Sequence, residues 1–315
     1  MPASEKTDSM ATLRIVHRTR YRYAAPVAFG PHRLLIRPRD AHDMRILDSK
    51  IGISPHADVS WHFDTFGNSV ALLTFRDRAS ELFIGSELVL RRYVFAEPEL
   101  QLDQQAAAYP FRYGPDENID LSPFLFVQVR QDRPAVEHWI QHILPRMPDR
   151  SMQVLNALSS AIHDGLDYIR REEQGVQSPA ETLTNESGTC RDYAFLFMEA
   201  VRTLGFAARF VTGYLYDASA DTGESGLVGG GATHAWAEVF LPGAGWVEFD
   251  PTNEIVAGRD LVRVATTRTP EQALPVRGSF IGSADAYLGM DVEVEVRKVD
   301  FDRDGERTAT QVDLG

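Results

Sequence analysis

The sequence has a single cysteine among its 315 residues, so it forms no internal disulfide. One thiol also leaves a zinc site short of ligands, and we expect neither a metal nor another cofactor. Apolar runs of roughly 20 residues, which a bilayer-spanning helix requires, are absent. The N-terminus, Met1-Pro-Ala-Ser-Glu-Lys, lacks the apolar segment of a secretory signal. We therefore expect a cytoplasmic protein that makes no membrane contact.

Positive charge is scarce as well. Lysine and arginine number 32 against 45 aspartates and glutamates, which gives a formal net charge of −13. This balance disfavours binding to nucleic acids or anionic membranes, because their phosphate groups would be repelled. Hydrophobic residues make up 43% of the chain, the ordinary share for a folded protein, and the length predicts about two domains.

The first hundred residues alternate between apolar and polar side chains, which is typical of half-buried strands. The predicted strands lie at residues 13–23, 59–63, 70–75 and 82–90. After a short disordered tail at residues 1–10, we expect an antiparallel β-sandwich domain, with its connector, within residues 11–125. This domain contains no cysteine and no close group of acidic residues or histidines, so its expected role is packing or recognition.

The pattern changes after a proline-rich connector at about residues 96–133. Helices are predicted at residues 134–144, 151–169 and 190–204, and strands at 207–216, 234–241 and 245–250. A Gly/Ser/Asp-rich stretch at 217–231 is expected to be a mobile loop. We expect an α+β catalytic domain at residues 126–300 and a C-terminal tail at 301–315.

Cys190 stands at the start of a predicted helix, directly after Ser187-Gly188-Thr189. The positive end of the helix dipole favours the ionised, nucleophilic form of a thiol at that place. A lone cysteine is more often an inert buried residue, so its surroundings decide between the two interpretations.

His234 is the only histidine after Cys190, and it opens a strand right after the glycine-rich loop. Asp250 ends the next strand. If residues 242–244 form a three-residue hairpin loop, Leu241 faces Gly245, and Asp250 then lies opposite Trp236 on the sheet face that carries His234. Diagonal neighbours of this kind have Cα atoms roughly 7–8 Å apart, within reach of a carboxylate and an imidazole.

These three side chains match the needs of nucleophilic catalysis. A thiolate attacks a carbonyl, an imidazole shares its proton, and a carboxylate orients the imidazole. The backbone N–H of Cys190 is placed to donate to an oxyanion, and Tyr168 is a candidate second donor. Trp236 is expected to pack in the core or to shield the substrate.

Several motifs then resemble the bacterial transglutaminase-like cysteine enzymes. The motifs lie at residues 188–194 (GTCRDYA), 204–214 (LGFAARFVTGY), 234–238 (HAWAE) and 245–253 (GWVEFDPTN), and residues 15–23 and 33–38 look like the β domain that precedes their core. The resemblance implies a papain-like fold in which Cys190 is the nucleophile, His234 the general base and Asp250 its orienting residue. Residues 261–268 depart from the pattern His-Ile-x-Val-Ala-x-Gly-Arg that members often carry there.

The predicted activity is hydrolysis of an amide bond in a peptide or protein substrate through an acyl-enzyme, because crosslinking requires water to be outcompeted and no amine site is recognisable. Two alternatives stay open. One is a protein-glutamine transglutaminase, in which an amine takes the acyl group. The other is a non-catalytic binding protein on the same fold. The oligomeric state is not predicted.

Overall fold

The computed structural model describes residues 9–94, 100–170, 175–217, 227–228, 232–258 and 260–299. The β domain contains two antiparallel sheets, of which the larger has the order β15-β1-β6-β3, with β16 also paired to β1. Its strands are β1 (Ser9–Phe29), β3 (Met44–Ser54), β6 (Arg78–Val94), β15 (Phe280–Ile281) and β16 (Tyr287–Lys298).

The smaller sheet has the order β14-β2-β5-β4. Its strands are β2 (His32–Leu34), β4 (Ala57–Phe63), β5 (Ser69–Phe75) and β14 (Val276–Arg277). Buried residues from both sheets, including Val27, Leu34, Leu73 and Ile84, form one hydrophobic cluster. Two sheets that share a core in this way form a sandwich, so the predicted antiparallel β domain is confirmed.

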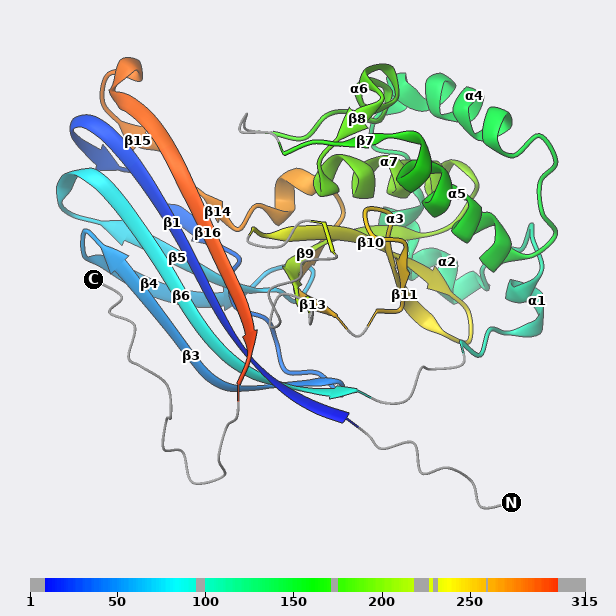
Figure 1. The fold of residues 1–315 in the computed structure, drawn as a ribbon, viewed down its shortest axis with the longest axis horizontal. Helices are drawn as coiled ribbons and strands as arrows, with labels where there is room; N and C mark the ends of the chain where they lie inside the picture. Colours follow the sequence, from blue (N-terminus) through cyan, green and yellow to red (C-terminus); the bar gives the residue numbers. More distant parts are fainter. Residues whose placement is uncertain are drawn as a thin grey trace.

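The last described strand returns to the first one. β16 pairs antiparallel with β1 from Leu13 opposite Lys298 to Tyr23 opposite Tyr287, and the two strands lie side by side in Figure 1. Residues 276–298 therefore add strands to the β domain, whereas we expected them within the catalytic domain. The alternation of this segment indicates a strand, but alternation does not specify a partner that lies more than 260 residues away in the sequence.

The second unit begins with short helices in the connector, where we expected irregular chain. The helices are α1 (Gln104–Ala107), α2 (Pro115–Asp120), α3 (Ser122–Leu125), the 3-10 helix η1 (Arg130–Asp132), α4 (Arg133–Ile143), α5 (Ser151–Gly165), α6 (Pro179–Asn185) and α7 (Cys190–Thr203). The predicted helix 151–169 ends earlier, at Gly165. Leu166 already has extended backbone angles, and β7 (Asp167–Tyr168) follows and pairs with β8 (Ser187–Gly188).

A five-stranded antiparallel sheet forms the centre of this unit, with the order β12-β11-β10-β9-β13. The strands are β9 (Ala208–Leu215), β10 (His234–Leu241), β11 (Gly245–Asp250), β12 (Ile255–Val256) and β13 (Leu261–Thr267). The strands predicted at 207–216, 234–241 and 245–250 are thus confirmed. Together with the helices they form a mixed α+β core, as expected.

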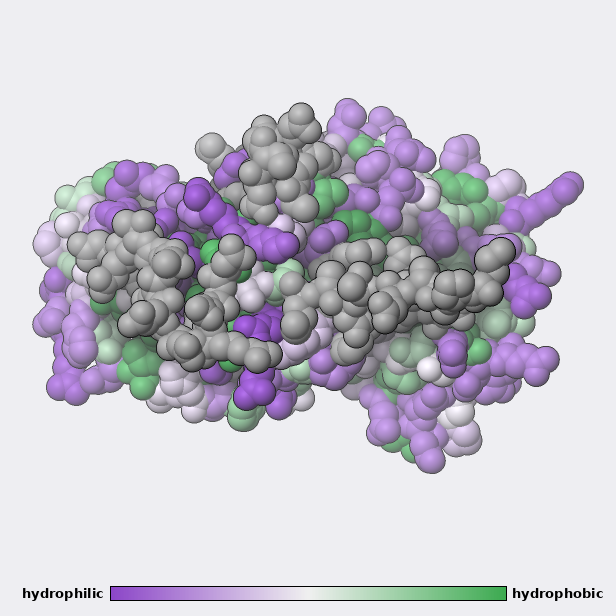
Figure 2. Space-filling view, turned by 60° about the horizontal axis from the view of Figure 1, so that its bottom comes forward, coloured by the Kyte–Doolittle hydropathy of each residue, from purple (hydrophilic) through white to green (hydrophobic). Residues whose placement is uncertain are grey.

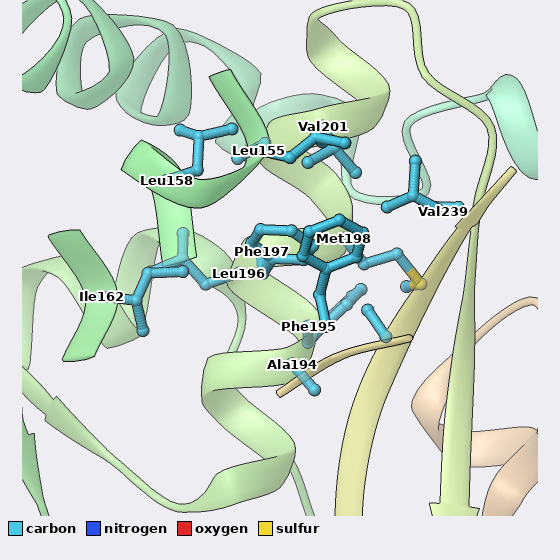
Figure 3. Close-up of a cluster of buried hydrophobic side chains, with 14 of the residues drawn as sticks. Leu155, Leu158, Ile162, Ala194, Phe195, Leu196, Phe197, Met198, Val201 and Val239 are labelled. Carbon is cyan, nitrogen blue, oxygen red and sulfur yellow. The ribbon is translucent and has the colours of Figure 1, made fainter. Parts of the chain in front are cut away.

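Helix α7 is the central helix of this core. Only Arg191 and Thr203 of its 14 residues are not buried, which is typical of a helix surrounded by other elements. Figure 3 shows its apolar residues between α5 and the sheet, where Phe197 and Val201 lie near Leu155 and Val239. Cys190, at one end of this helix, is therefore attached to a rigid element.

The two units share an interface. A buried cluster joins residues of β1 and β6 to Tyr214, Val262 and Val264 of the central sheet. Asn68, in the turn after β4, donates from Nδ2 to the carbonyl of Thr266 (2.8 Å) and accepts from the Thr266 N–H (2.9 Å). The amide side chain thus continues the hydrogen bonding of β13 into the β domain.

Hydrophilic residues predominate on the face of the molecule in Figure 2, and hydrophobic residues lie there in scattered patches. Among the helices in the described ranges, none combines the length and the apolar character needed to span a bilayer.

Candidate active site

Cys190 is the first residue of α7 and is 6% exposed. The loop before it is held by the buried carboxylate of Asp192. Asp192 Oδ2 accepts from the N–H and the hydroxyl of Thr189 (2.8 and 2.9 Å), and Oδ1 accepts from the N–H of Gln177 (2.7 Å). These bonds fix the direction in which the chain enters the helix, and hence the position of the thiol.

Gly188 lets this loop approach the helix closely. A Cβ atom at Gly188 would lie 2.9 Å from Cβ of Asp192 and 3.2 Å from the ring of Tyr193. The same residue pairs with Tyr168 in the parallel bridge between β7 and β8, and the Ile169 N–H donates to its carbonyl. The small residue therefore brings Tyr168 and Cys190 into one neighbourhood.

The hairpin of β10 and β11 brings His234 and Asp250 together. Leu241 pairs with Gly245, so the register predicted from the three-residue loop is confirmed. His234 Nε2 lies 2.8 Å from Asp250 Oδ2, and both side chains are fully buried. The other ring nitrogen of His234, Nδ1, is buried without a hydrogen-bond partner in the described part of the chain. One side of the imidazole is thus bound by a carboxylate, and the other is open to a proton transfer.

Asp250 accepts further hydrogen bonds. Its Oδ1 accepts from the Thr252 N–H (2.9 Å), and its Oδ2 accepts from Nδ2 of Asn253 (2.9 Å). Asn253 also binds both backbone groups of Val228: Nδ2 donates to the carbonyl (3.1 Å), and Oδ1 accepts from the N–H (2.8 Å). Asp250 therefore has a fixed orientation before any substrate arrives.

The electrostatics of the pair favour its charged form. Burial alone lowers the pKa of His234, but Asp250 and the Cys190 thiol nearby outweigh burial and raise this pKa from 6.5 to about 10. Burial raises the pKa of Asp250, whereas His234, Asn253 and the Thr252 N–H hold it below its usual range. The imidazolium–carboxylate pair is consequently the stable state at neutral pH.

Tyr168 lies beside the thiol. Burial, and secondly the negative charge of Cys190, raise the pKa of Tyr168 to about 12. The phenol hydroxyl therefore keeps its proton at neutral pH and remains a hydrogen-bond donor. The role of Tyr168 as an oxyanion donor stays a prediction.

Trp236 lies behind His234, with ring centroids 6.1 Å apart. It is fully buried in a cluster with Val211, Leu215 and Leu261. Gly213 on β9 makes room for it, because a Cβ there would lie 2.6 Å from the indole. Trp236 thus packs against the rear of the histidine and has no exposed surface.

Sequence reasoning missed three residues of this site. Asn253 belongs to a quoted motif, but its contacts depend on Val228 in another segment. Asp192 stands three residues after Thr189, the spacing of a capping box, which is a signal that the sequence does contain. Arg191 donates to the Pro270 carbonyl (2.9 Å) and lies over the ring of Phe210.

No group of three or more His, Cys, Asp or Glu side chains within the described ranges is arranged to hold a metal ion. The glycine-rich stretch expected to be mobile, at 217–231, lies outside the described residues except for 217 and 227–228.

The sequence matches two protein families. Residues 13–91 match the bacterial transglutaminase-like N-terminal region, and residues 140–251 match the transglutaminase-like superfamily. The second match contains Cys190, His234 and Asp250, and the first covers most of the β domain's first six strands.

Several curated proteins are similar to this chain. An uncharacterized protein of Mycobacterium bovis is 28% identical over 296 residues, which cover 90% of this chain and 91% of that protein. An uncharacterized protein of Mycobacterium leprae is 25% identical over 292 residues, or 90% of this chain and 99% of that protein. A protein-glutamine gamma-glutamyltransferase of Pseudomonas aeruginosa is 36% identical over 73 residues, or 23% of this chain and 11% of that protein.

Among solved structures, a protein of Cytophaga hutchinsonii described as a candidate cysteine protease has the same fold. Its TM-score is 0.69 at 19% sequence identity, and the match covers 93% of this chain and 92% of that chain. Both units of the present fold thus occur together in a second protein.

Proposed function

We propose that this chain, whose residues 140–251 match the transglutaminase-like superfamily, hydrolyses an amide bond of a peptide or protein substrate through an acyl-enzyme on Cys190. One observation carries the proposal. His234 is bound by Asp250 at Nε2, while its Nδ1 is buried, has no other hydrogen-bond partner in the described part of the chain and lies near the thiol. This is the arrangement that a thiolate–imidazolium pair needs.

In the first half of the reaction, the thiol proton resides on Nδ1 of His234, and the Cys190 thiolate attacks the carbonyl carbon. A C–S bond forms, and the carbonyl oxygen takes the negative charge. As the oxyanion collapses, the C–N bond breaks, and His234 transfers its proton to the leaving nitrogen. The amine leaves, and a thioester on Cys190 remains.

In the second half, water attacks the thioester. The thiolate that raised the pKa of His234 is now part of the acyl group, so that contribution disappears, the pKa of His234 falls, and a larger fraction of the imidazole is neutral and able to accept a proton. His234 takes the proton of the water, the C–S bond breaks, and the acid product leaves. His234 can therefore serve in both proton transfers, because Cys190 is a charged thiolate before acylation and an uncharged thioester after it.

The oxyanion needs donors. The N–H of Cys190, as the first N–H of α7, has no intrahelical acceptor and is available to the carbonyl oxygen. We assign the second bond to the hydroxyl of Tyr168, which burial and the nearby thiol keep protonated. We assign no catalytic role to Trp236, whose buried position supports packing.

The competing activity is transfer of the acyl group to an amine, which passes through the same acyl-enzyme. A mixture of peptides that contain glutamine, incubated with and without a primary amine such as cadaverine, distinguishes the two by mass spectrometry. Hydrolysis predicts new peptide termini or the conversion of glutamine to glutamate, both absent with Cys190→Ala. Incorporation of cadaverine as the main product would instead favour the transferase. Absence of any product would favour a binding protein.

A further inference from the structure

The β domain contains an open pocket of about 500 Å³. Its walls come from the segment after β2 and from strands β3, β4 and β5, with Arg37, Ser49, Trp61, His62, Phe63 and Ser69 among the lining residues. None of the residues of the candidate active site contributes to it. Its volume lies in the range of small-molecule and peptide side-chain sites.

The pocket exists because the sandwich is open between β3 and β4, which are the edge strands of their sheets. Trp61 pairs with the buried Ala71, and Val59 pairs with the buried Leu73. Trp61 and Phe63 therefore lie on the sheet face that elsewhere forms the core, yet they are 45% and 67% exposed. Two aromatic side chains on the inner face of a sandwich are thus available to a ligand.

Arg37 supplies a positive charge to this aromatic pocket. Its Nε donates to the Ser49 hydroxyl (3.3 Å), and its guanidinium lies 6.0 Å from the ring centre of Trp61. Among the described residues no carboxylate pairs with Arg37. The other arginines of this domain that have a carboxylate partner include Arg14, Arg18, Arg20, Arg22 and Arg33.

Arg39, Arg45, Arg78 and Arg91 of this domain also have no carboxylate partner among the described residues, but of these arginines only Arg37 lines the pocket. The planar guanidinium binds a carboxylate through two parallel hydrogen bonds, and aromatic rings bind apolar or aromatic side chains. Arg39 extends the positive surface, since its guanidinium lies 4.8 Å from the ring centre of Phe63.

We propose that this pocket is a second substrate-binding site, which holds a carboxylate of a peptide at Arg37 and an adjacent apolar side chain against Trp61 and Phe63. The inference rests on the proposed function, because a peptide is the occupant that an amide-cleaving enzyme offers. The free edge of β4, which pairs only with β5, also suits an extended peptide that adds as a further strand. The carboxylate comes from the C-terminus of the peptide or from an acidic side chain, and either one can pair with the guanidinium of Arg37.

Calorimetry on full-length Cys190→Ala protein, which does not turn over its ligand, tests the site. The probes are acetyl-Gly-Phe-Ala-Phe with a free C-terminal carboxylate, the same peptide as C-terminal amide, and acetyl-Gly-Phe-Glu-Phe-amide. Binding of the first or third probe at least tenfold tighter than the amide is expected, since a charge-assisted bidentate pair is lost in the amide. The first probe reports a C-terminal site, and the third an acidic side chain.

Adding Arg37→Gln should remove this preference, and Trp61→Ala should weaken all three peptides. Arg20→Gln is the matched control, because Arg20 lies outside the pocket and pairs with Glu81. Equal binding of all three probes, or an unchanged preference in Arg37→Gln protein that melts like the parent, would overturn the proposal. Binding of glucuronic acid without binding of any peptide would also overturn it in favour of a sugar site.

Kinetics separate this site from the proposed function. With Cys190 intact, Arg37→Gln should raise KM about tenfold for a substrate that carries the carboxylate and leave kcat unchanged. Peptide binding at Arg37 without turnover by the wild type would refute the proposed function and leave the site standing. Turnover with identical KM values for wild type and Arg37→Gln would refute the site alone.

Discussion

Replacement of Asp250 by Asn tests how the carboxylate controls His234. The substitution keeps the size of the side chain but removes its charge. In the wild type Asp250 and Cys190 together outweigh burial and hold the pKa of His234 at about 10. Without the carboxylate, Cys190 alone opposes burial, the largest single contribution, so the pKa falls and the imidazolium is lost at a lower pH.

The expected magnitude follows from the protonated fraction. If the pKa of His234 returns only to 6.5, about one imidazole in 30 remains protonated at pH 8. We therefore expect kcat/KM at pH 8 to fall at least about 30-fold, and more where the amide also disturbs the orientation of the ring. The alkaline limb of the pH–rate profile should move from near pH 10 to below pH 7.

Initial rates from pH 6 to 11, with the peptide that the screen identifies, measure both quantities. Thr252→Ser is a matched control, because the N–H that binds Asp250 belongs to the backbone and stays in place. An Asp250→Asn protein that is folded and keeps the wild-type rate and alkaline limb would refute the role of Asp250 in holding the imidazolium.

The site makes four further predictions. Cys190→Ala should abolish turnover while the melting temperature stays close to that of the wild type, and residual wild-type activity would exclude Cys190 as the nucleophile. Gly188→Ala should lower the free energy of unfolding by about 1–3 kcal/mol in urea titrations, because the added Cβ overlaps Asp192 and Tyr193; an unchanged midpoint would contradict the crowding. The stabilisation that the raised pKa of His234 contributes should be complete below pH 6.5 for as long as Asp250 stays ionised, decline above pH 6.5 and vanish above pH 10, as titrations of unfolding at several pH values will show. EDTA should leave the activity unchanged; loss of activity after EDTA is added would show that a metal is required.

Local pattern sufficed to predict the hairpin that joins His234 to Asp250. A three-residue loop fixes the parity of both strands, so the face on which each side chain lies follows from counting. Helix α7 was predictable for a similar reason, because the residues that start and stop it, Thr189 and Gly205, lie directly beside its two ends in the sequence. The family resemblance and the fold class were predicted from the motifs and their order along the chain.

Non-local contacts were not predictable in the same way. The alternation of residues 287–298 indicates a strand, but its pairing with β1 depends on which sheet edge is free after the whole chain has folded. Residues 59–63 likewise read as a half-buried strand, and the exposure of Trp61 and Phe63 depends on how the two sheets pack, which the local pattern does not specify. The roles of Asn253 and Arg37 likewise depend on contacts with other segments, with Val228 for Asn253 and with Ser49 and Trp61 for Arg37.

The central claim is that Cys190 is a thiolate activated by His234. The rate of alkylation by iodoacetamide, measured from pH 5 to 9 in the wild type and in His234→Ala, tests it directly, because the chain has no other thiol. The account predicts labelling at pH 6 that is faster than that of free cysteine in the wild type and much slower in the variant. Labelling that follows an ordinary thiol in both proteins would contradict it.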